Sequence, residues 1–355
     1  MITKLNQKLN EKIAALVKPK VVTRVGLDIG SYSVKCVEII QDDKKVGLRS
    51  AQIKRLASNS ADNLRAALRA IRLGLSSPIK HIRISVSGPS VLIRNVTLPR
   101  MTPQELKSAI RFEAERHIPF QINECAVDYQ VIGQTSDKVS MKVLLIVAKK
   151  DFIDQQLKAL SDCDLEPEII DSDIFCFANA FEKLADDSQA KTYGLLNIGH
   201  SLSSFATIHD KQIFFVRETP FGGLGVTKAL AEFKKIPEEA AEDKKKRREP
   251  ELLPDLFWAT QKGFEPLVEE MKRSIDYFEN EAGEELKEIY IAGGGARSQG
   301  ACEVLSEELG RKVQLWDKIK KTDIIGHVEP KFLEEHFAEL NVAFGLALRG
   351  TGQNR

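Results

Sequence analysis

Val25-Gly-Leu-Asp-Ile-Gly30 and Leu195-Leu-Asn-Ile-Gly199 are two copies of one short pattern, an apolar run that ends in a polar residue, Ile and Gly. Alternating apolar residues follow each copy, over 33–40 and over 203–216, and predict further strands. A strand, a tight turn and a meander that occur twice, with helical segments behind each, indicate two similar α/β halves.

A third glycine-bearing segment, Ile289-Tyr-Ile-Ala-Gly-Gly-Gly-Ala296, predicts a strand that enters a turn before a helix over about 300–309. Glycine lacks the Cβ that would keep a phosphate or an aromatic base away from the backbone amides. Each segment alone is a common pattern, but the three in this order, with the repeat, predict a nucleotide site.

The first two turns carry small polar residues that suit a phosphate. Asp28, at the end of the first strand, is placed to hold a Mg²⁺-bound water. The candidates are Gly30, Ser31, Tyr32 and Ser33 in the first turn and Gly199, His200 and Ser201 in the second.

Composition excludes several other classes of protein. The 355 residues carry a net charge of +1, which gives no sign of a nucleic-acid partner. Five cysteines without a C-x-x-C pair argue against disulfides and zinc, and fit a reducing cytoplasm. No run approaches the ~20 apolar residues of a spanning helix. The P-loop and dinucleotide-binding motifs are absent, and the six histidines show no ligand spacing.

The segments between these motifs predict the remaining organisation. Residues 2–17 show an amphipathic helical pattern that suits docking on protein or on a membrane surface. A small α/β unit is expected over about 96–166, where Thr102 and Glu105 predict a capping box. Residues 42–45 predict a turn, and 186–189 a linker. The charged stretch 234–255 suits either a tether or an exposed helix from about 237, and 263–280 predicts a long amphipathic helix.

Taken together, the three segments resemble the phosphate-1, phosphate-2 and adenosine motifs of the actin, Hsp70 and FtsA superfamily. Within it they are most similar to the PilM family, actin-like proteins of type IV pilus assembly. The resemblance covers about residues 24–350. It is carried by 26–35, similar to the family's D-I-G-S-x-S-V-K, by the I-P-F turn at 118–120, by Asp128-Tyr-Gln130, by 170–182, by Phe221-Gly-Gly223 and by 274–278.

The resemblance implies an α/β, actin-like (ribonuclease H-like) duplicated fold of the FtsA type. Its implied parts are an N-terminal helix (1–20), subdomain 1A (21–95 and 167–190), subdomain 1C (96–166), subdomain 2A (191–220 and 286–355) and subdomain 2B (221–285).

It also implies that Mg²⁺ and ATP lie between the halves. The first group of ligands would be Asp28, Ser31, Ser33 and Lys35, and Gly199 with its neighbours would face the phosphates from the other side. Gly293, Gly294 and Gly295, with Arg297 beside them, would flank the adenosine. Ala241-Glu-Asp-Lys-Lys245 is similar to the family's A-E-x-x-K, so that Glu242 and Lys245 would contact the ribose.

One residue departs from the family pattern. The second strand usually ends in Asp-Ile-Gly, whereas this chain has Asn197, which can still accept a hydrogen bond from a metal-bound water but carries no charge. With Asp28 and Asn197 as the metal-facing pair and His200 crowding the phosphates, we expect weak or absent ATP hydrolysis.

The implied function is that of a cytoplasmic adaptor at the inner membrane, peripheral to it through a partner. The adaptor would bind ATP and the N-terminal cytoplasmic tail of a PilN-type bitopic protein. Self-association stays open. A filament-forming FtsA-like protein is the first alternative, disfavoured by a C-terminus without an amphipathic helix. A sugar-kinase-like phosphotransferase is the second, with Asp171 or Asp173 as its base.

Overall fold

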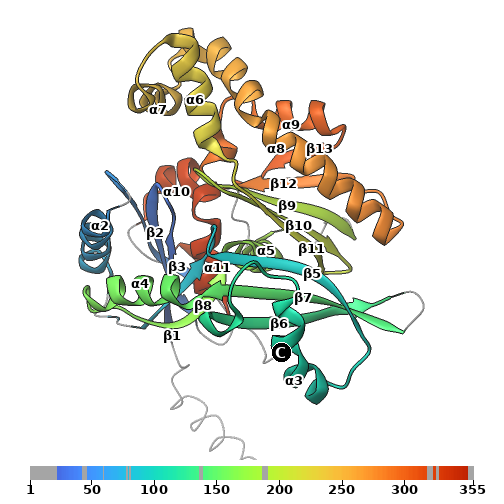
Figure 1. The fold of residues 1–355 in the computed structure, drawn as a ribbon. Helices are drawn as coiled ribbons and strands as arrows, with labels where there is room; N and C mark the ends of the chain where they lie inside the picture. The colour runs from blue at the N-terminus through green and yellow to red at the C-terminus, as the bar shows by residue number, and fades with distance from the viewer. Residues whose placement is uncertain are drawn as a thin grey trace, which may run out of the picture.

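The computed structural model describes residues 22–41, 46–58, 60–76, 79, 81–135, 139–185, 191–317, 323–324 and 328–350. The predicted helix over 2–17, the turn at 42–45 and the linker at 186–189 lie outside these ranges. None of the described helices is both long enough and apolar enough to span a membrane. Figure 1 shows the arrangement, with α3 at the bottom of the view and α6 and α7 at the top.

The first sheet begins as an antiparallel meander and continues with parallel strands, in the order β14-β3-β2-β1-β4-β8. Its strands are β1 (Val22–Ile29), β2 (Ser33–Gln41), β3 (Val46–Arg55), β4 (His81–Val86), β8 (Glu166–Ser172) and β14 (Asp323–Ile324). Helices α2 (Ala61–Leu73) and α4 (Lys150–Ser161) cover one face, where Leu68, Ile71 and Leu160 are buried against the strands.

The second sheet repeats the first, in the order β11-β10-β9-β12-β13. Its strands are β9 (Thr192–Ile198), β10 (Ser203–His209), β11 (Gln212–Thr219), β12 (Glu288–Ala292) and β13 (Lys312–Leu315). In both sheets a three-stranded antiparallel meander is extended by two strands parallel to its first strand. The duplication predicted from the repeated pattern is therefore present in the topology.

Four helices belong to this second half: α6 (Gly223–Lys234), α7 (Glu238–Arg247), α8 (Leu253–Ala282) and α9 (Ala301–Leu309). Helices α8 and α9 contact the sheet, and α7 packs on α6. The charged stretch forms α7, which decides between the two predicted alternatives in favour of a helix. Helix α8 begins at Leu253, ten residues before the predicted start, because Leu256 and Ala259 continue its buried face. A Cβ at Gly263 would lie 2.4 Å from the backbone nitrogen of Val226, so α6 and α8 cross at a glycine.

A third, smaller sheet has the order β5-β7-β6 and consists of β5 (Val91–Pro99), β6 (Cys125–Gln134) and β7 (Ser140–Lys149). Helix α3 (Pro103–Glu115) packs against it and has the predicted capping box between Thr102 and Glu105. Two features differ from the division expected at 96–166. Strand β5 already begins at Val91, and α4 places Ala159 and Leu160 in the core of the first sheet.

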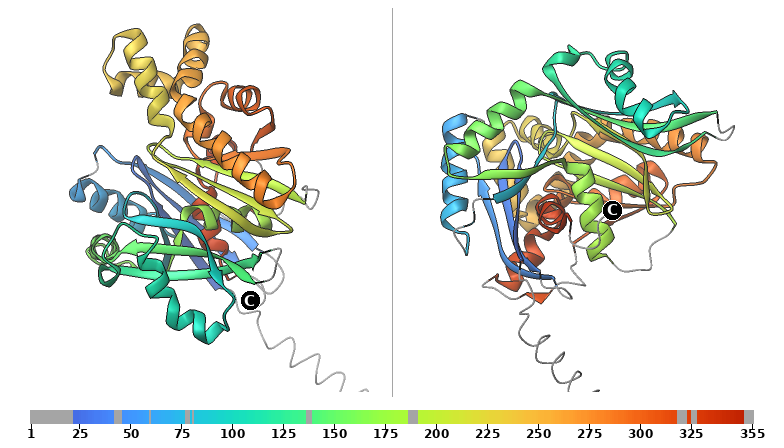
Figure 2. Two further views of the ribbon diagram at one scale, coloured as in Figure 1. Left: turned by 45° about the vertical axis from the view of Figure 1, so that its right-hand side comes forward. Right: turned by 90° about the horizontal axis from the view of Figure 1, so that it is seen from below.

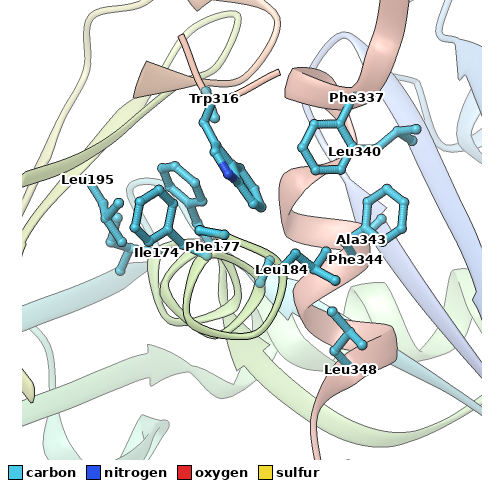
Figure 3. Close-up of a cluster of buried hydrophobic side chains, with 14 of the residues drawn as sticks. Ile174, Phe177, Leu184, Leu195, Trp316, Phe337, Leu340, Ala343, Phe344 and Leu348 are labelled. Atoms are coloured by element: carbon cyan, nitrogen blue, oxygen red, sulfur yellow. The ribbon is translucent and has the colours of Figure 1, made fainter. Parts of the chain in front are cut away.

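The largest apolar cluster lies where the three sheets meet, around α5 (Asp173–Leu184) and α11 (Asn341–Leu348). Figure 3 shows this cluster, with Phe177 of α5, Trp316 directly after β13, and Phe344 of α11. Figure 2 gives two further views of the ribbon. The short helix α10 (Pro330–His336) contributes Leu333.

The C-terminal elements pack differently from the expected assignment of 286–355 to the second half. Strand β14 pairs with β3 of the first sheet, and a Cβ at Gly26 of β1 would lie 2.1 Å from the carbonyl oxygen of Ala343 in α11. A Cβ at Gly345 of α11 would lie 1.8 Å from the carbonyl oxygen of Cys176 in α5. The chain thus returns to the first half after β13, because its last helix completes the apolar core there.

Candidate nucleotide site

The first turn connects β1 and β2 and is closed by a hydrogen bond from the Gly30 N–H to the Ser33 carbonyl, 3.1 Å long. Asp28 and Lys35 are cross-strand neighbours in this hairpin, and the Lys35 Nζ donates to Asp28 Oδ2 at 2.9 Å. Burial lowers the pKa of Lys35, but the Asp28 carboxylate and its hydrogen bond outweigh burial and raise the pKa overall. The lysine is therefore a fixed cation directly beside the turn.

The second turn connects β9 and β10 with the same geometry, since the Gly199 N–H donates to the Leu202 carbonyl at 2.9 Å. The two turns contact each other. Ser31 Oγ lies 2.9 Å from Ser201 Oγ, and the rings of Tyr32 and His200 stack with centroids 4.6 Å apart. Burial lowers the pKa of His200, so this ring is neutral at physiological pH.

The third loop follows β12, and its three glycines have different surroundings. Gly293 has φ +93° and a Cβ there would lie 2.3 Å from the Ile198 carbonyl oxygen. At Gly295 a Cβ would lie 2.5 Å from Ile198 Cγ2, whereas at Gly294 the nearest atoms among the described residues belong to Glu339, at 3.9 Å. The protein itself requires Gly293 and Gly295, and Gly294 presents an open face.

Arg297 lies at the end of this third loop. Its Nε is 3.9 Å from Glu339 Oε1, and its carbonyl accepts a hydrogen bond from Arg248. Burial is the largest effect on the pKa of Glu339 and raises it, but His336, Lys35 and Arg297 lower the pKa overall. Glu339 is therefore an ionised group at the side where the adenosine is expected.

Glu242 and Lys245 lie together on α7, 2.6 Å apart, facing α6. Lys245 Nζ also donates to the Gly223 carbonyl at 2.9 Å and to Thr227 Oγ1 at 2.7 Å. The Gly223 N–H in turn donates to the Gly199 carbonyl at 2.9 Å, which ties the start of α6 to the second turn. The lysine therefore reaches the same part of the molecule as the three glycine loops.

Asn197, which was expected to face a metal, forms a buried side-chain hydrogen bond. Its Oδ1 accepts a hydrogen bond from the Asn341 side chain at 3.0 Å, and both residues are buried. The same oxygen would lie 2.7 Å from a Cβ at Gly293. The structure thus directs this amide toward α11 and the third loop. Among the residues that it describes, no group of three His, Cys, Asp or Glu side chains is arranged to hold a metal ion.

Two further carboxyl groups interact in this region, Asp173 with Asp28 and Glu218 with Asp173. Burial, then the Asp28 charge, raises the pKa of Asp173, at the start of α5, to about 6. Burial, then Asp173, raises the pKa of Glu218 on β11 to about 8. Asp171, the other residue considered as a base, instead forms an ion pair with Arg349. Asp173 is thus the candidate that could accept a proton at this site.

The structure brings the predicted site residues of all three loops and of α7 into one region through the contacts above. Sequence reasoning missed several of their partners, which are Arg55, Glu218, Thr227, Lys246, Arg248, Glu339 and Asn341. Lys246 directly follows the predicted Lys245, so its helix offered a signal. Glu339 and Asn341 are far along the chain from every motif and offered none.

Two duplicated sheets with glycine turns that meet between them define a protein of the actin-like class, as predicted. The fold is similar to that of "PilM-PilN type IV pilus biogenesis complex", with a TM-score of 0.79 and 23% identity over 94% of this chain and 99% of the other. It is also similar to ethanolamine utilization protein EutJ from Carboxydothermus hydrogenoformans, with a TM-score of 0.53 and 18% identity over 93% and 90%. MreB5 of Spiroplasma citri bound to ADP gives a TM-score of 0.51 and 9% identity over 93% and 96%. Residues 26–351 match the family described as type IV pilus assembly protein PilM, and the chain belongs to this family.

Proposed function

We propose that this protein is an adaptor of type IV pilus assembly that binds ATP between its two halves and a membrane-protein tail on its surface. The observation that carries the proposal is the match to the PilM family over 26–351, combined with the contact between the two glycine turns. The similarity to a solved PilM-PilN complex supports a PilN-type partner. A partner of that type would keep this chain at the cytoplasmic face of the inner membrane.

The site residues fit a nucleoside triphosphate. Ser31 and Ser201 donate to or accept from each other, and both hydroxyls can donate to phosphate oxygens instead. Lys35 and Lys245 supply positive charge from the two halves, and the face of Gly294 is open for adenosine. Mg²⁺, when bound, would neutralise phosphate charge, and Asp28 is the residue that would hold one of its waters.

We propose further that hydrolysis is slow. The Asn197 oxygen is already engaged by Asn341, and the amide lacks the charge that would strengthen a bond to a metal-bound water. Asp173, with its pKa near 6, is ionised at neutral pH and would be the base in any residual turnover. Rapid steady-state ATP turnover by the purified protein that is abolished in Asp173→Asn would contradict slow hydrolysis.

The subdomain division follows the packing. Subdomain 1A would contain the first sheet with α2, α4, α5 and α11, and subdomain 1C the small sheet with α3. Subdomain 2A would contain the second sheet with α9, and subdomain 2B the helices α6–α8. The partner tail would lie between 1A and 1C, where an extended peptide could use main-chain hydrogen bonds and apolar contacts.

The decisive experiment measures both ligands on the full chain. Calorimetric titration with a synthetic peptide of the PilN-type tail, with and without ATP and Mg²⁺, should show tighter binding when nucleotide is present. A peptide of scrambled sequence is the control. Absence of peptide binding in both conditions would refute the adaptor, and absence of ATP binding by equilibrium dialysis would refute the nucleotide site.

A further inference from the structure

Helix α7 carries two parallel rows of charged residues. Glu242 and Lys245 form the row that faces α6, where both contact Thr227. Asp243 and Lys246 are each one position further along, so at about 100° per residue they form a second row on the neighbouring face. This second row points away from α6 and contacts the other half of the protein.

The second row meets Tyr32 and Arg55 across the boundary between the two halves, where the nucleotide is proposed to lie and which we call the cleft. Arg55, at the end of β3, has its Nη1 3.3 Å from Asp243 Oδ1, and its guanidinium carbon lies 4.8 Å from the Tyr32 ring centroid. Lys246 Nζ lies 4.0 Å from the same centroid and donates to the Tyr32 hydroxyl. His200 stacks on the ring. Tyr32 is thus held by two cations and a second ring.

We infer that Tyr32, Arg55, His200, Asp243 and Lys246 form a cross-cleft clasp that holds α7 against the first turn and so sets the rate at which nucleotide leaves. The inference rests on the proposed nucleotide site, because α7 also carries Glu242 and Lys245. The clasp residues on β3 and α7 are positioning residues, since they act on the nucleotide through the placement of that helix.

Helix α7 depends on such polar contacts more than its neighbours do. Of its ten residues only Ala241 and Glu242 are buried, so little apolar surface fixes its position. Lys246 lies 3.6 Å from Glu242 Oε1 and thereby links the second row to the row that faces α6. A loss of the contacts made by the second row should therefore displace Glu242 and Lys245 as well.

The test reverses one charge and then exchanges the pair. Arg55→Asp removes the ion pair with Asp243 and one cation on Tyr32, and should speed release of a fluorescently labelled ATP by roughly 3- to 10-fold. The double variant Arg55→Asp/Asp243→Arg restores the ion pair and should recover most of this change. Arg65→Asp is the matched control, because Arg65 forms a similar ion pair with Asp62 on α2, away from the cleft.

A second measurement needs no nucleotide. Hydrogen exchange of the amides in 238–247 should be faster in Arg55→Asp, unchanged in Arg65→Asp, and slowed again in the exchanged pair. If exchange in α7 does not respond to Arg55→Asp, the clasp is refuted. If exchange responds but release does not, control of release is refuted. If the unaltered protein binds no labelled ATP, the proposed nucleotide site fails, and exchange alone decides whether the clasp exists.

Discussion

Gly293 and Gly294 are neighbours that should respond to the same substitution in different ways. At Gly293 the backbone has φ +93°, and an added Cβ would lie 2.3 Å from the Ile198 carbonyl and 2.7 Å from Asn197 Oδ1. At Gly294 the atoms nearest to the added Cβ in the described part of the chain belong to the Glu339 side chain, at 3.9 Å, which is an ordinary contact distance. Alanine at the first position perturbs the protein, whereas alanine at the second fills space that the ligand would use.

The expected cost at Gly293 has two parts. A left-handed conformation costs a residue with a Cβ about 1–2 kcal/mol. Overpacking against backbone atoms that cannot rotate away costs about 1–3 kcal/mol more. Gly293→Ala should therefore lower the free energy of unfolding by about 2–5 kcal/mol, and Gly294→Ala should lower it by less than about 0.5 kcal/mol, as for substitutions away from strained or packed positions.

Urea denaturation of both variants measures the first effect, and binding of labelled ATP measures the second. We expect Gly294→Ala, and more strongly Gly294→Val, to weaken ATP binding at unchanged stability. Gly293→Ala should lose stability whether or not nucleotide is present. Equal stability of the two alanine variants would refute the packing argument, and full ATP affinity in Gly294→Val would refute the assignment of its open face to adenosine.

Three other substitutions test the core and the cleft. Gly345→Ala places a Cβ 1.8 Å from the Cys176 carbonyl and should destabilise the α5–α11 crossing by at least about 1–3 kcal/mol, as measured by urea denaturation. Asp28→Ala leaves the largely buried Lys35 cation without its carboxylate partner and should cost about 3 kcal/mol. Asp28→Ala/Lys35→Met should recover stability but not ATP binding, and recovery of both would contradict the role of the pair. Glu218 has its pKa raised from 4.5 to about 8, so between these pH values the folded state binds more protons than the unfolded state. The contribution of this group to the free energy of unfolding therefore falls as pH rises through that window. Thermal denaturation of Glu218→Gln should therefore show a smaller decline in stability from about pH 4.5 to 8 than the unaltered protein, and parallel pH profiles would contradict the burial argument.

The local parts of the fold and site could be predicted because their causes are local. The capping box at Thr102 and Glu105 depends on residues three apart. Asp28 and Lys35 were each named as site residues, and the register of one hairpin makes them a pair. The repetition of one hairpin pattern was sufficient to predict two related sheets. That the two turns face one nucleotide between the halves was implied by the resemblance to the family and not by the repeat itself.

The remainder depends on packing between distant segments. Nothing near Asn341 or Gly345 indicates that α11 returns to the first sheet, because its apolar residues suit any core. The contact of Asn341 with Asn197 spans 144 positions and arises only once α11 is seated. The early start of α8 was missed for a related reason: one face of its first turns packs against α6, and local charge alone suggested an exposed segment.

The halves are joined by an apolar core around α5 and α11 and by polar contacts at the cleft. These contacts differ in strength, and this difference limits how the protein can respond to a nucleotide. Around α5 and α11 large side chains such as Phe177, Phe181 and Phe344 are fully buried, and burying each one contributes about 1.5–3 kcal/mol. At the cleft each exposed ion pair or cation–ring contact contributes only about 0.2–1 kcal/mol. A ligand that adds a few contacts at the cleft can rearrange the polar contacts there but cannot separate the apolar core around α5 and α11.

Nucleotide binding should therefore move α7 and the turns that it touches, while the halves pivot only slightly about the shared core. A partner tail bound between 1A and 1C would respond to the nucleotide through that pivot. The reason is that α11 packs on the first sheet and also contacts Asn197, which lies just before the second turn.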